Sequence, residues 1–239
     1  MTDADAASRS VGVVVVAAGS GTRLGAERPK AFVVLAGRSL LERSLEASLA
    51  AGATSVVAVV PGELVGEATT MTGRLRTRTG TSVRVVSGGA ERTDSVRAGL
   101  AALGPECDLV LVHDAARCLT PVDVFERVIA ALAEGAAGAV PGLPVVDTVK
   151  TVDARGVITG TPDRSTLRSV QTPQGFAARV LSAAYASADT AGARATDDAA
   201  LVEMCGHDVL VVEGDPLGFK ITTRDDLHRA EHLLSEGAR

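Results

Sequence analysis

The segment from Ala17 to Lys30 holds glycines and cationic side chains at a spacing suited to binding phosphate. Gly19 and Gly21 let the backbone bring N–H donors close to an anion, and Arg23 and Lys30 add fixed positive charge. The sequence has no P-loop spacing, and a dinucleotide fingerprint fails because a leucine stands where its third glycine is required. Such cations would stabilise a phosphoryl-type transfer. The alternative is a plain strand-to-loop turn with exposed basic residues.

A second pair of glycines, Gly88 and Gly89, stands directly before a predicted helix. A nucleotide base can approach a glycine backbone closely, and Ser95 on the helix could hydrogen-bond that base. The alternative is that the polar side chains here only cap the helix, through Thr93 or Asp94. The residues taken alone favour the capping interpretation.

Three charged side chains outside the glycine segments also predict ligand binding. Asp114 ends a predicted buried strand, where open α/β sheets place ligand-binding groups, and a carboxylate there can hold Mg²⁺. Arg117 could meet a phosphate or ribose, or could form an ion pair with Asp114 that only shapes the loop. Lys220 lies between Phe219 and Ile221, where an unpaired cation is costly. Lys220 therefore predicts a buried anionic ligand.

Short β-branched runs predict the strands that position these residues. Near-continuous valine without alternation is typical of strands buried on both faces of a mostly parallel sheet. With helical signals between them, the runs predict a doubly wound, Rossmann-like α/β fold. We expect residues 1–239 to form a single domain, with residues 1–10 as a flexible tail. The predicted strands are Val11–Ala18, Ser55–Val60, Val83–Val86, Leu109–Val112, Ala137–Val140 and Val209–Val212.

Cap and stop signals predict where several helices begin and end. A capping box at Ser39 opens a helix that Gly52 ends, and Pro121 opens another. Thr196 is expected to cap a helix carrying the acidic residues that follow it, and Thr223 begins the last helix.

The segment at about residues 144–170 departs from this rhythm. Val145–Val152 and Val157–Thr161 flank a turn that ends at Gly156, which predicts a protruding β-hairpin arm. Its alternating valine and polar residues predict strands buried on one face only. Because a two-stranded arm is marginally stable alone, we expect it to pack on another subunit and form a homodimer.

Seven motifs together suggest a family. The run A-A-G-x-G-x-R, followed by Pro29 and Lys30, is similar to the signature of nucleotidyltransferases that transfer a nucleoside monophosphate to a phosphorylated alcohol or sugar. The later stretches GGAERTDSV, VHDAAR, PVVDTVK, QTPQGF, TDDA and FKIT, in this order, resemble the 2-C-methyl-D-erythritol 4-phosphate cytidylyltransferase family. The resemblance implies a nucleotidyltransferase fold. It also implies transfer of CMP from CTP to methylerythritol 4-phosphate, with release of pyrophosphate, in non-mevalonate isoprenoid synthesis.

The resemblance also implies which residues act. Arg23 and Lys30 would be catalytic, and Asp114 would hold Mg²⁺ or another divalent cation. Arg164, or the nearby Arg168, would reach the substrate phosphate in the other subunit's site. The nucleotide-binding residues would be Ala17, Ala18, Gly19, Gly21, Gly88, Gly89, Ser95, Asp114, Ala115 and Lys220. The substrate-binding residues would be Arg117, Asp147, Thr148, Arg164, Thr172 and Thr196.

The implied reaction needs no general base, because a phosphate oxygen of the acceptor is already an anionic nucleophile. It would attack the α-phosphorus of CTP in line, while positioning and cationic charge supply the catalysis. Two alternatives stay open. The acceptor could be another polyol phosphate, such as ribitol 5-phosphate, or the chain could be a nucleotide-binding regulatory protein that has lost catalysis.

Composition limits the partners and the location. A formal net charge of −5 and 2% aromatic residues argue against nucleic-acid binding, which uses basic surfaces and stacking rings. Cys107, Cys118 and Cys205 are widely spaced and predict buried thiols in a reducing compartment. Cys118 has no local histidine partner, so we expect no thiol catalysis. An acidic N-terminus and the lack of a long apolar run predict a cytoplasmic protein without a membrane segment.

Overall fold

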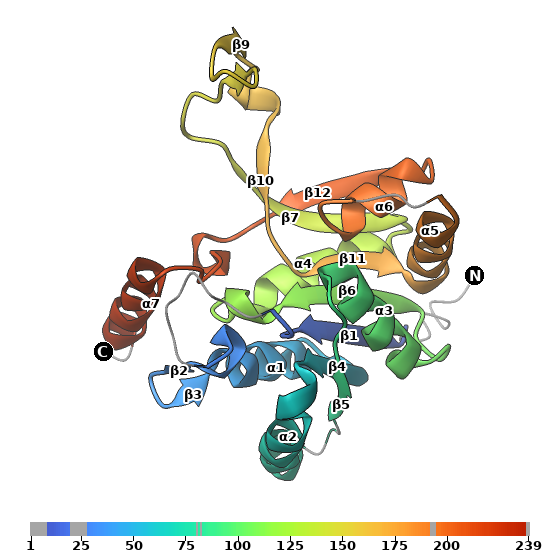
Figure 1. The fold of residues 1–239 in the computed structure, drawn as a ribbon. Helices are drawn as coiled ribbons and strands as arrows, with labels where there is room; N and C mark the ends of the chain where they lie inside the picture. Colours follow the sequence, from blue (N-terminus) through green and yellow to red (C-terminus); the bar gives the residue numbers. More distant parts are fainter. Residues whose placement is uncertain (1–8, 20–27, 80, 82, 192–194, 238–239) are drawn as a thin grey trace, which may run out of the picture.

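An eight-stranded sheet forms the centre of the computed structural model, which describes residues 9–19, 28–79, 81, 83–191 and 195–237 (Figure 1). The strand order is β10-β7-β11-β6-β1-β4-β5, and β12 also pairs with β7. These strands are β10 (Arg168–Val170), β7 (Gly138–Pro144), β11 (Gln174–Ala177), β6 (Leu109–Asp114), β1 (Val11–Val16), β4 (Ser55–Val60), β5 (Val83–Ser87) and β12 (Val209–Glu213).

Most neighbouring strands run parallel, as the valine runs predict. β1 is parallel to β4 and β6, β4 to β5, and β7 to β12. β11 runs antiparallel between β6 and β7, and β10 is antiparallel to β7. Neither antiparallel strand is predicted from the sequence, because both are short and neither is a β-branched run. The doubly wound, mostly parallel α/β fold is confirmed.

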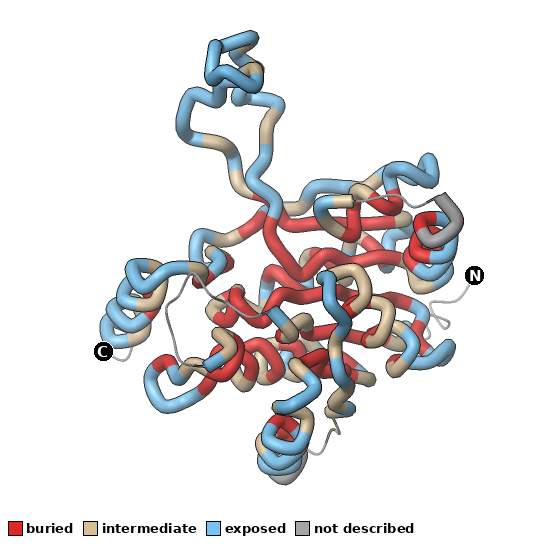
Figure 2. Tube along the Cα trace, viewed as in Figure 1, coloured by how far each residue is buried: buried red, intermediate tan, exposed pale blue. Residues whose placement is uncertain are grey.

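Helices cover both faces of the sheet and produce two apolar cores (Figure 2). In β1, Val13 and Val15 belong to the first core and Val14 to the second, because successive side chains of a strand point to opposite faces. No helix among the described residues is long and apolar enough to cross a membrane. One face carries α1 (Leu40–Ala50), α2 (Val65–Thr79) and α4 (Val122–Ala133), and the other carries α3 (Arg92–Leu103), α5 (Ala178–Ala191) and α6 (Asp198–Met204).

The helix boundaries agree with the predicted caps at several positions and differ at one. Ser39 forms the predicted capping box with Glu42, and the Thr223 hydroxyl accepts the N–H of Asp226 at the start of α7 (Arg224–Gly237). The prediction for Thr196 was wrong: it is exposed, and the next residue, Asp197, accepts the N–H of Ala200 as the N-cap of α6. Aspartate caps at least as well as threonine, so adjacent candidates cannot be separated by residue type.

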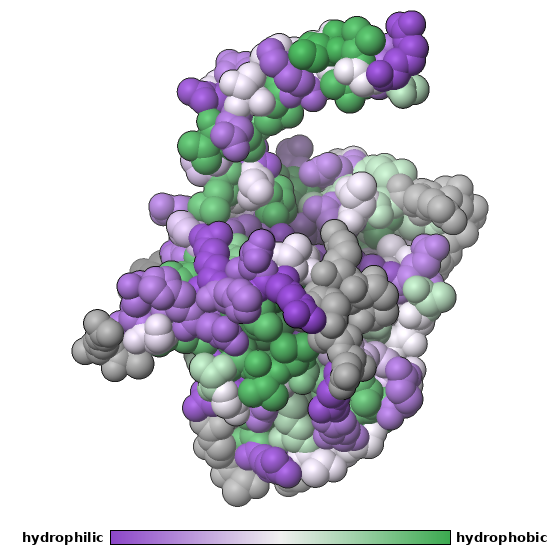
Figure 3. Space-filling view, turned by 60° about the vertical axis from the view of Figure 1, so that its left-hand side comes forward, coloured by the Kyte–Doolittle hydropathy of each residue, from purple (hydrophilic) through white to green (hydrophobic). Residues whose placement is uncertain are grey.

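The hairpin arm projects from the sheet between β7 and β10 (Figure 1). β8 (Thr151–Val152) and β9 (Ile158–Gly160) pair antiparallel around a turn that Asp153 stabilises through the N–H groups of Arg155 and Val157. Both strands are shorter than predicted. Neither face is buried within this chain, since Val152 and Ile158 are 58% and 59% exposed. Apolar side chains are visible along the arm in Figure 3.

The predicted flexible tail lies mostly outside the described residues. Its last two residues are hydrogen bonded to the fold: Ser10 donates to the carboxylate of Asp108 and the carbonyl of Glu106, and Arg9 donates to the carbonyl of Leu132. The start of β1 is therefore fixed where the chain approaches the sheet.

Candidate active site

A cavity of about 180 Å³ opens at the carboxyl ends of β1 and β6 and beside the start of α3. The chain leaves β1 toward β4 and β5 and later returns to form β6 on the other side of β1. Ligands bind where the strand order reverses in this way. We call this the nucleotide cavity, after the ligand that the sequence resemblance implies. It is lined by Val16, Ala17, Ala18, Gly19, Lys30, Gly89, Ala90, Glu91, Arg92, Ser95, Asp114, Ala115, Ala116 and Lys220.

Two chain segments meet closely on one wall of the nucleotide cavity. A Cβ added to Gly88 would lie 2.4 Å from the Cβ of Ala18, so Gly88 is needed for packing and lies behind the wall. The N–H of Gly89 donates to Ser95 Oγ over 3.2 Å, and that hydroxyl donates to the carbonyl of Glu91. The Ser95 hydroxyl thus donates its one proton within the fold, and it can still accept a second hydrogen bond from a ligand in the cavity.

The residues at the start of α3 both cap the helix and line the cavity, so neither interpretation of this motif excludes the other. Glu91 and Asp94 form a reciprocal capping box, so Asp94 does cap the helix while Thr93 does not. Ser95 nevertheless lines the cavity and is almost completely buried. Capping and ligand approach are therefore compatible here, because they use different residues of the same turn.

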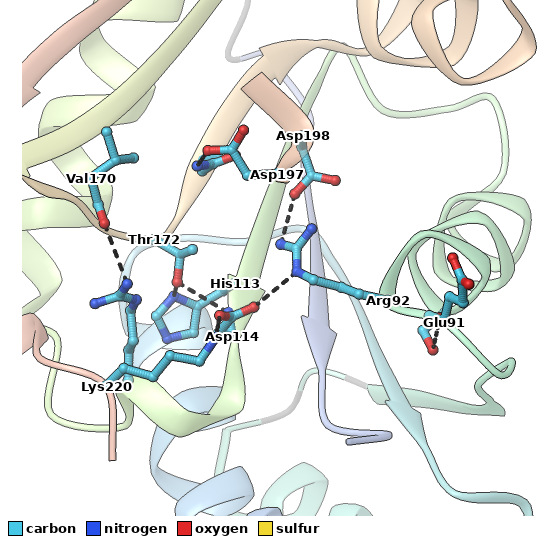
Figure 4. A network of polar contacts seen from close by, with 12 residues as sticks. Glu91, Arg92, His113, Asp114, Val170, Thr172, Asp197, Asp198 and Lys220 are labelled. Carbon is cyan, nitrogen blue, oxygen red and sulfur yellow. Dashed lines mark hydrogen bonds and ion pairs between the residues drawn. The ribbon is translucent and has the colours of Figure 1, made fainter. Parts of the chain in front are cut away.

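Asp114, at the end of β6, holds two cations (Figure 4). Its Oδ2 lies 2.6 Å from Lys220 Nζ, and its Oδ1 lies 3.3 Å from Arg92 Nε. Burial raises the pKa of Asp114, but the charges of Arg92 and Lys220 outweigh burial and keep that pKa well below its usual range. Asp114 is consequently a carboxylate throughout the physiological pH range.

Lys220 is not left unpaired, as its apolar neighbours in the sequence suggested, because Asp114 of the same chain is its counter-ion. Lys220 also lines the nucleotide cavity, so an anionic ligand there stays a prediction. Its side chain is also 40% exposed, although the next residue, Ile221, is buried and donates its N–H to the carbonyl of Ala116. The partners are 106 residues apart in sequence, so local composition does not reveal the pair.

In the part of the chain that the structure describes, Arg117 does not form the alternative ion pair with Asp114. In η4 (Ala115–Arg117), its guanidinium donates to the carbonyl of Gly218 over 2.7 Å and to that of Val170 over 3.3 Å. Burial lowers the pKa of Arg117, and the charge of Asp114 opposes that effect. Neutral carbonyls orient the guanidinium but leave its charge available to an anion.

Thr172 supports Asp114 from behind rather than facing the nucleotide cavity. Its Oγ1 accepts the Asp114 N–H over 3.0 Å and lies 3.1 Å from Nδ1 of His113. Burial lowers the pKa of His113 to about 4, so the ring is neutral at pH 7 and forms a neutral hydrogen bond with the Thr172 hydroxyl. The ring also packs against Phe125. Thr172 and His113 therefore fix the backbone at the end of β6.

Comparisons with known proteins show to which family this chain belongs. The family model for 2-C-methyl-D-erythritol 4-phosphate cytidylyltransferase matches residues 11–236. The enzyme of that name from Nocardia farcinica (strain IFM 10152) is 53% identical over 239 residues, covering 100% of this chain and 99% of the relative. A relative of the same name from Rhodococcus jostii (strain RHA1) is 54% identical over 226 residues, or 94% and 95% of the two chains.

The chain belongs to the 2-C-methyl-D-erythritol 4-phosphate cytidylyltransferase family. A solved structure of that name from Thermus thermophilus has a TM-score of 0.76 and 36% identity, covering 95% of this chain and 99% of that one. A 4-diphosphocytidyl-2C-methyl-D-erythritol synthase from Anaerococcus prevotii DSM 20548 has a TM-score of 0.83, 27% identity and the same two coverages. The protein is therefore a cytidylyltransferase, and the inactive regulatory alternative is set aside.

Many of the residues implied by the cytidylyltransferase family converge in the structure, while others do not. Gly21 and Arg23 lie outside the described residues. Asp147, Thr148 and Arg164 are exposed on the arm, and Thr196 is exposed before α6. Arg164 donates to the carbonyl of Val146 within the arm. The nucleotide cavity brings together Ala17, Ala18, Gly19, Lys30, Gly89, Ser95, Asp114, Ala115 and Lys220, with Gly88 and Thr172 behind its wall.

Glu91 and Arg92 also line the nucleotide cavity, but neither was predicted from the sequence. Arg92 is the first residue of α3, where the positive end of the helix dipole disfavours a cation. A cation at that position was the available signal, because it requires a nearby anion. The structure supplies two, Asp114 and Asp198.

The three cysteines take no part in this site. Cys107 and Cys118 are buried as predicted, whereas Cys205 is exposed, against the prediction. It is the C-cap residue of the short helix α6, which ends at the surface. Burial raises the pKa of the Cys118 thiol to about 12, so it is not a nucleophile at neutral pH.

Proposed function

We propose that the nucleotide cavity binds CTP and that this chain transfers CMP to the 4-phosphate of 2-C-methyl-D-erythritol, as its family name states. A phosphate oxygen of the acceptor forms a bond to the α-phosphorus of CTP. The bond from that phosphorus to the oxygen bridging to the β-phosphate breaks, and pyrophosphate leaves. The carrying observation is that Lys220 and Arg92 hold the ionised Asp114 on the wall of a cavity that Lys30 also lines.

Backbone and small side chains suit the nucleoside end of the cavity. Ala17 and Ala18 follow β1, and Gly89 adds no side chain to the wall beside them, so a flat base can lie against this wall. Ser95 keeps acceptor capacity toward a base amino group. We therefore assign the base and ribose to this end, with the triphosphate directed toward Lys30.

Catalysis in this scheme comes from placed positive charge. Lys30 opens η2 (Lys30–Phe32) and lines the cavity, and Arg23 belongs to the segment that precedes it. We propose that Lys30 and Arg23 stabilise charge on the transferring and leaving phosphates. Lys220 would then orient the acceptor phosphate for in-line attack.

A divalent cation, with Mg²⁺ as our proposal, fits the donor set at Asp114. Magnesium in such sites is held by one or two carboxylates together with substrate phosphates and water, and Asp114 is an ionised carboxylate on the cavity wall. The described residues hold no cluster of three or more His, Cys, Asp or Glu side chains suited to a metal, so the phosphates would supply the remaining ligands. When bound, the ion would neutralise phosphate charge.

The acceptor side uses residues outside the nucleotide cavity. Arg117 is available to an anion, and Asp147 and Thr148 on the arm offer polar groups to a polyol. We propose that the arm completes the site of a second copy, with Arg164 as the residue that reaches the acceptor phosphate there. Exposed apolar residues on the arm, including Val146 at 83% and Val157 at 53%, support burial against a partner.

Pyrophosphate release tests the reaction directly. We expect rapid release with CTP and methylerythritol 4-phosphate, and little with CTP alone or with ribitol 5-phosphate. Faster release with ribitol 5-phosphate would favour the alternative polyol substrate. No release with either acceptor, from protein with a cooperative unfolding transition, would overturn the proposed function.

Subunit complementation tests the arm. Lys30→Met and Arg164→Ala chains, each weakly active alone, are unfolded, mixed in equal amounts and refolded together. A mixed dimer pairs the intact cavity of the Arg164 variant with the intact arm of the Lys30 variant, so about a quarter of wild-type activity should return. A monomeric mass in solution, or no recovery in a demonstrated mixed dimer, would contradict the shared site.

We also infer a cytoplasmic location. The nucleotide substrate and the three cysteines, all free in this structure, support a reducing compartment. Fractionation of cells that express the tagged chain tests this location, since the protein should follow cytoplasmic marker enzymes.

A further inference from the structure

Asp198, at the start of α6, is a buried carboxylate to which the family motifs assign no role. Its side chain has 0% exposure, and a buried charge is costly unless it is paired and hydrogen bonded. Arg92 Nη2 lies 2.8 Å from its Oδ2, and the Tyr185 hydroxyl donates to its Oδ1 over 2.5 Å. Asp198 thus has partners from two other helices, α3 and α5.

Arg92 connects this buried carboxylate to the nucleotide cavity (Figure 4). One edge of its guanidinium faces Asp198, while its Nε faces Asp114 Oδ1 at 3.3 Å. A planar guanidinium can hold two carboxylates in fixed directions, whereas a lysine ammonium is a single point charge. Burial lowers the pKa of Arg92, but its two carboxylates outweigh burial and raise that pKa, so the charge is permanent.

Tyr185 anchors the other end of the chain of contacts. Its ring lies in the second core, and the Arg97 guanidinium lies 5.5 Å from the ring centroid. Burial and the charge of Asp198 raise the pKa of the Tyr185 phenol, so the hydroxyl remains a donor. The contacts Tyr185–Asp198–Arg92–Asp114 therefore run from the packed core to the cavity wall.

We propose that Arg92, held by Asp198 and Tyr185, is a positioning residue that directs Asp114 toward the reacting phosphates. One edge of the Arg92 guanidinium is paired with Asp198, so its charge neutralises Asp114 only in part. The Oδ2 atom of Asp114 stays directed at Lys220. Without the charge of Asp198, Arg92 pairs with Asp114 alone and quenches it. This role rests on the proposed nucleotide site.

Steady-state kinetics separate positioning from direct nucleotide binding. Asp198→Asn keeps the shape but removes the charge, and we expect kcat to fall about 10- to 100-fold while KM for CTP changes little. Arg92→Lys, which cannot span both carboxylates, should give the same pattern, and Tyr185→Phe a smaller loss. If Arg92 instead acts only by touching nucleotide, Arg92→Lys raises KM and Asp198→Asn leaves kcat at the wild-type value. That result would overturn the proposal.

Asp108→Asn is the matched control for stability. Asp108 stands just before β6, at the opposite end of that strand from Asp114, and its carboxylate accepts hydrogen bonds from Ser10. The variant loses a bonded carboxylate but touches neither the cavity nor the contact chain. We expect its kcat to match wild type even where its midpoint of unfolding falls as far as that of Asp198→Asn.

The chain supplies its own spectroscopic reporter, because Tyr185 is its single tyrosine and it has no tryptophan. Tyrosine labelled with ¹³C at Cζ gives one NMR signal, and magnesium pyrophosphate is the probe. We expect the wild-type signal to shift on binding, and the shift to vanish in Arg92→Lys although calorimetry still detects binding. Wild-type binding without a shift would overturn the positioning role alone. Absence of wild-type binding would overturn the proposed nucleotide site as well.

Discussion

Lys220 Nζ and Asp114 Oδ2 lie 2.6 Å apart, so a short cation–anion contact at the cavity joins two of its own residues. A substrate phosphate must compete with Asp114 for Lys220. The Asp114 carboxylate therefore opposes anion binding until another cation neutralises it.

Asp114→Asn should strengthen binding of pyrophosphate in the absence of metal. The change removes a negative charge beside the anion and frees Lys220 and Arg92, so we expect at least about tenfold tighter binding. Calorimetry in EDTA measures it, with Asp108→Asn as the control. Turnover should fall at the same time, because the carboxylate proposed to hold the divalent cation is gone. Weaker pyrophosphate binding would show that Asp114 does not oppose the anion.

Lys30→Met should lower kcat more than it raises KM for CTP. Its charge is proposed to act on the phosphates as negative charge develops, and removal of one such group costs about 10²- to 10³-fold. Arg84→Met, which removes an exposed cation near the start of β5, is the control and should keep wild-type rates. A Lys30→Met enzyme with unchanged kcat would remove Lys30 from the mechanism.

His113 should make stability depend on pH between about 4 and 6.5. Burial lowers its folded-state pKa from 6.5 to about 4, so in this window the unfolded chain binds more protons and the free energy of unfolding rises with pH. This stability is complete above pH 6.5 and is lost as pH falls toward 4.

His113→Asn keeps an acceptor for Thr172 but does not titrate there. Urea unfolding at several pH values should show the wild-type advantage growing by roughly 3 kcal/mol across the window. An equal pH dependence in both proteins would mean that the ring is not held neutral.

Gly88→Ala should destabilise the fold and the cavity wall together. The new Cβ would lie 2.4 Å from Ala18 Cβ, and such overpacking costs about 1–3 kcal/mol. Gly73→Ala is the matched change, because a Cβ on Gly73 in α2 meets nothing within 4 Å. It should stabilise by about 0.5–1 kcal/mol. Thermal unfolding measures both, and equal effects would contradict the packing role of Gly88.

The parallel strands could be predicted because burial on both faces requires runs such as Val11–Val16. Strand β11 could not be predicted in this way, because it contains Gln174 and Gly175 rather than a β-branched run. Gln174 hydrogen bonds to Asp197, and Gly175 packs where a side chain would clash, and both surroundings form only in the folded chain. Helix α2 is rich in glycine and threonine, which are weak helix formers. Its position becomes clear only from its packing on the sheet.

The residues of the candidate site also fall into a group that the sequence predicts and a group that it does not. Gly19, Ser95 and Asp114 could be located because each belongs to a local pattern of glycine, cap or strand end. The pairing of Lys220 with Asp114, and that of Arg92 with Asp198, each join residues 106 positions apart. No spacing rule operates over that distance, so these contacts depend on the topology of the sheet.

This long-range construction affects how the protein becomes active during synthesis. The first residue of the cavity wall along the chain is Val16, and the last is Lys220, which shortly precedes helix α7. A nascent chain can form β1, β4 and β5 early, yet it lacks the last cation until nearly all of it has left the ribosome. Nucleotide affinity should therefore report complete folding, and partly synthesised chains should neither retain CTP nor consume it.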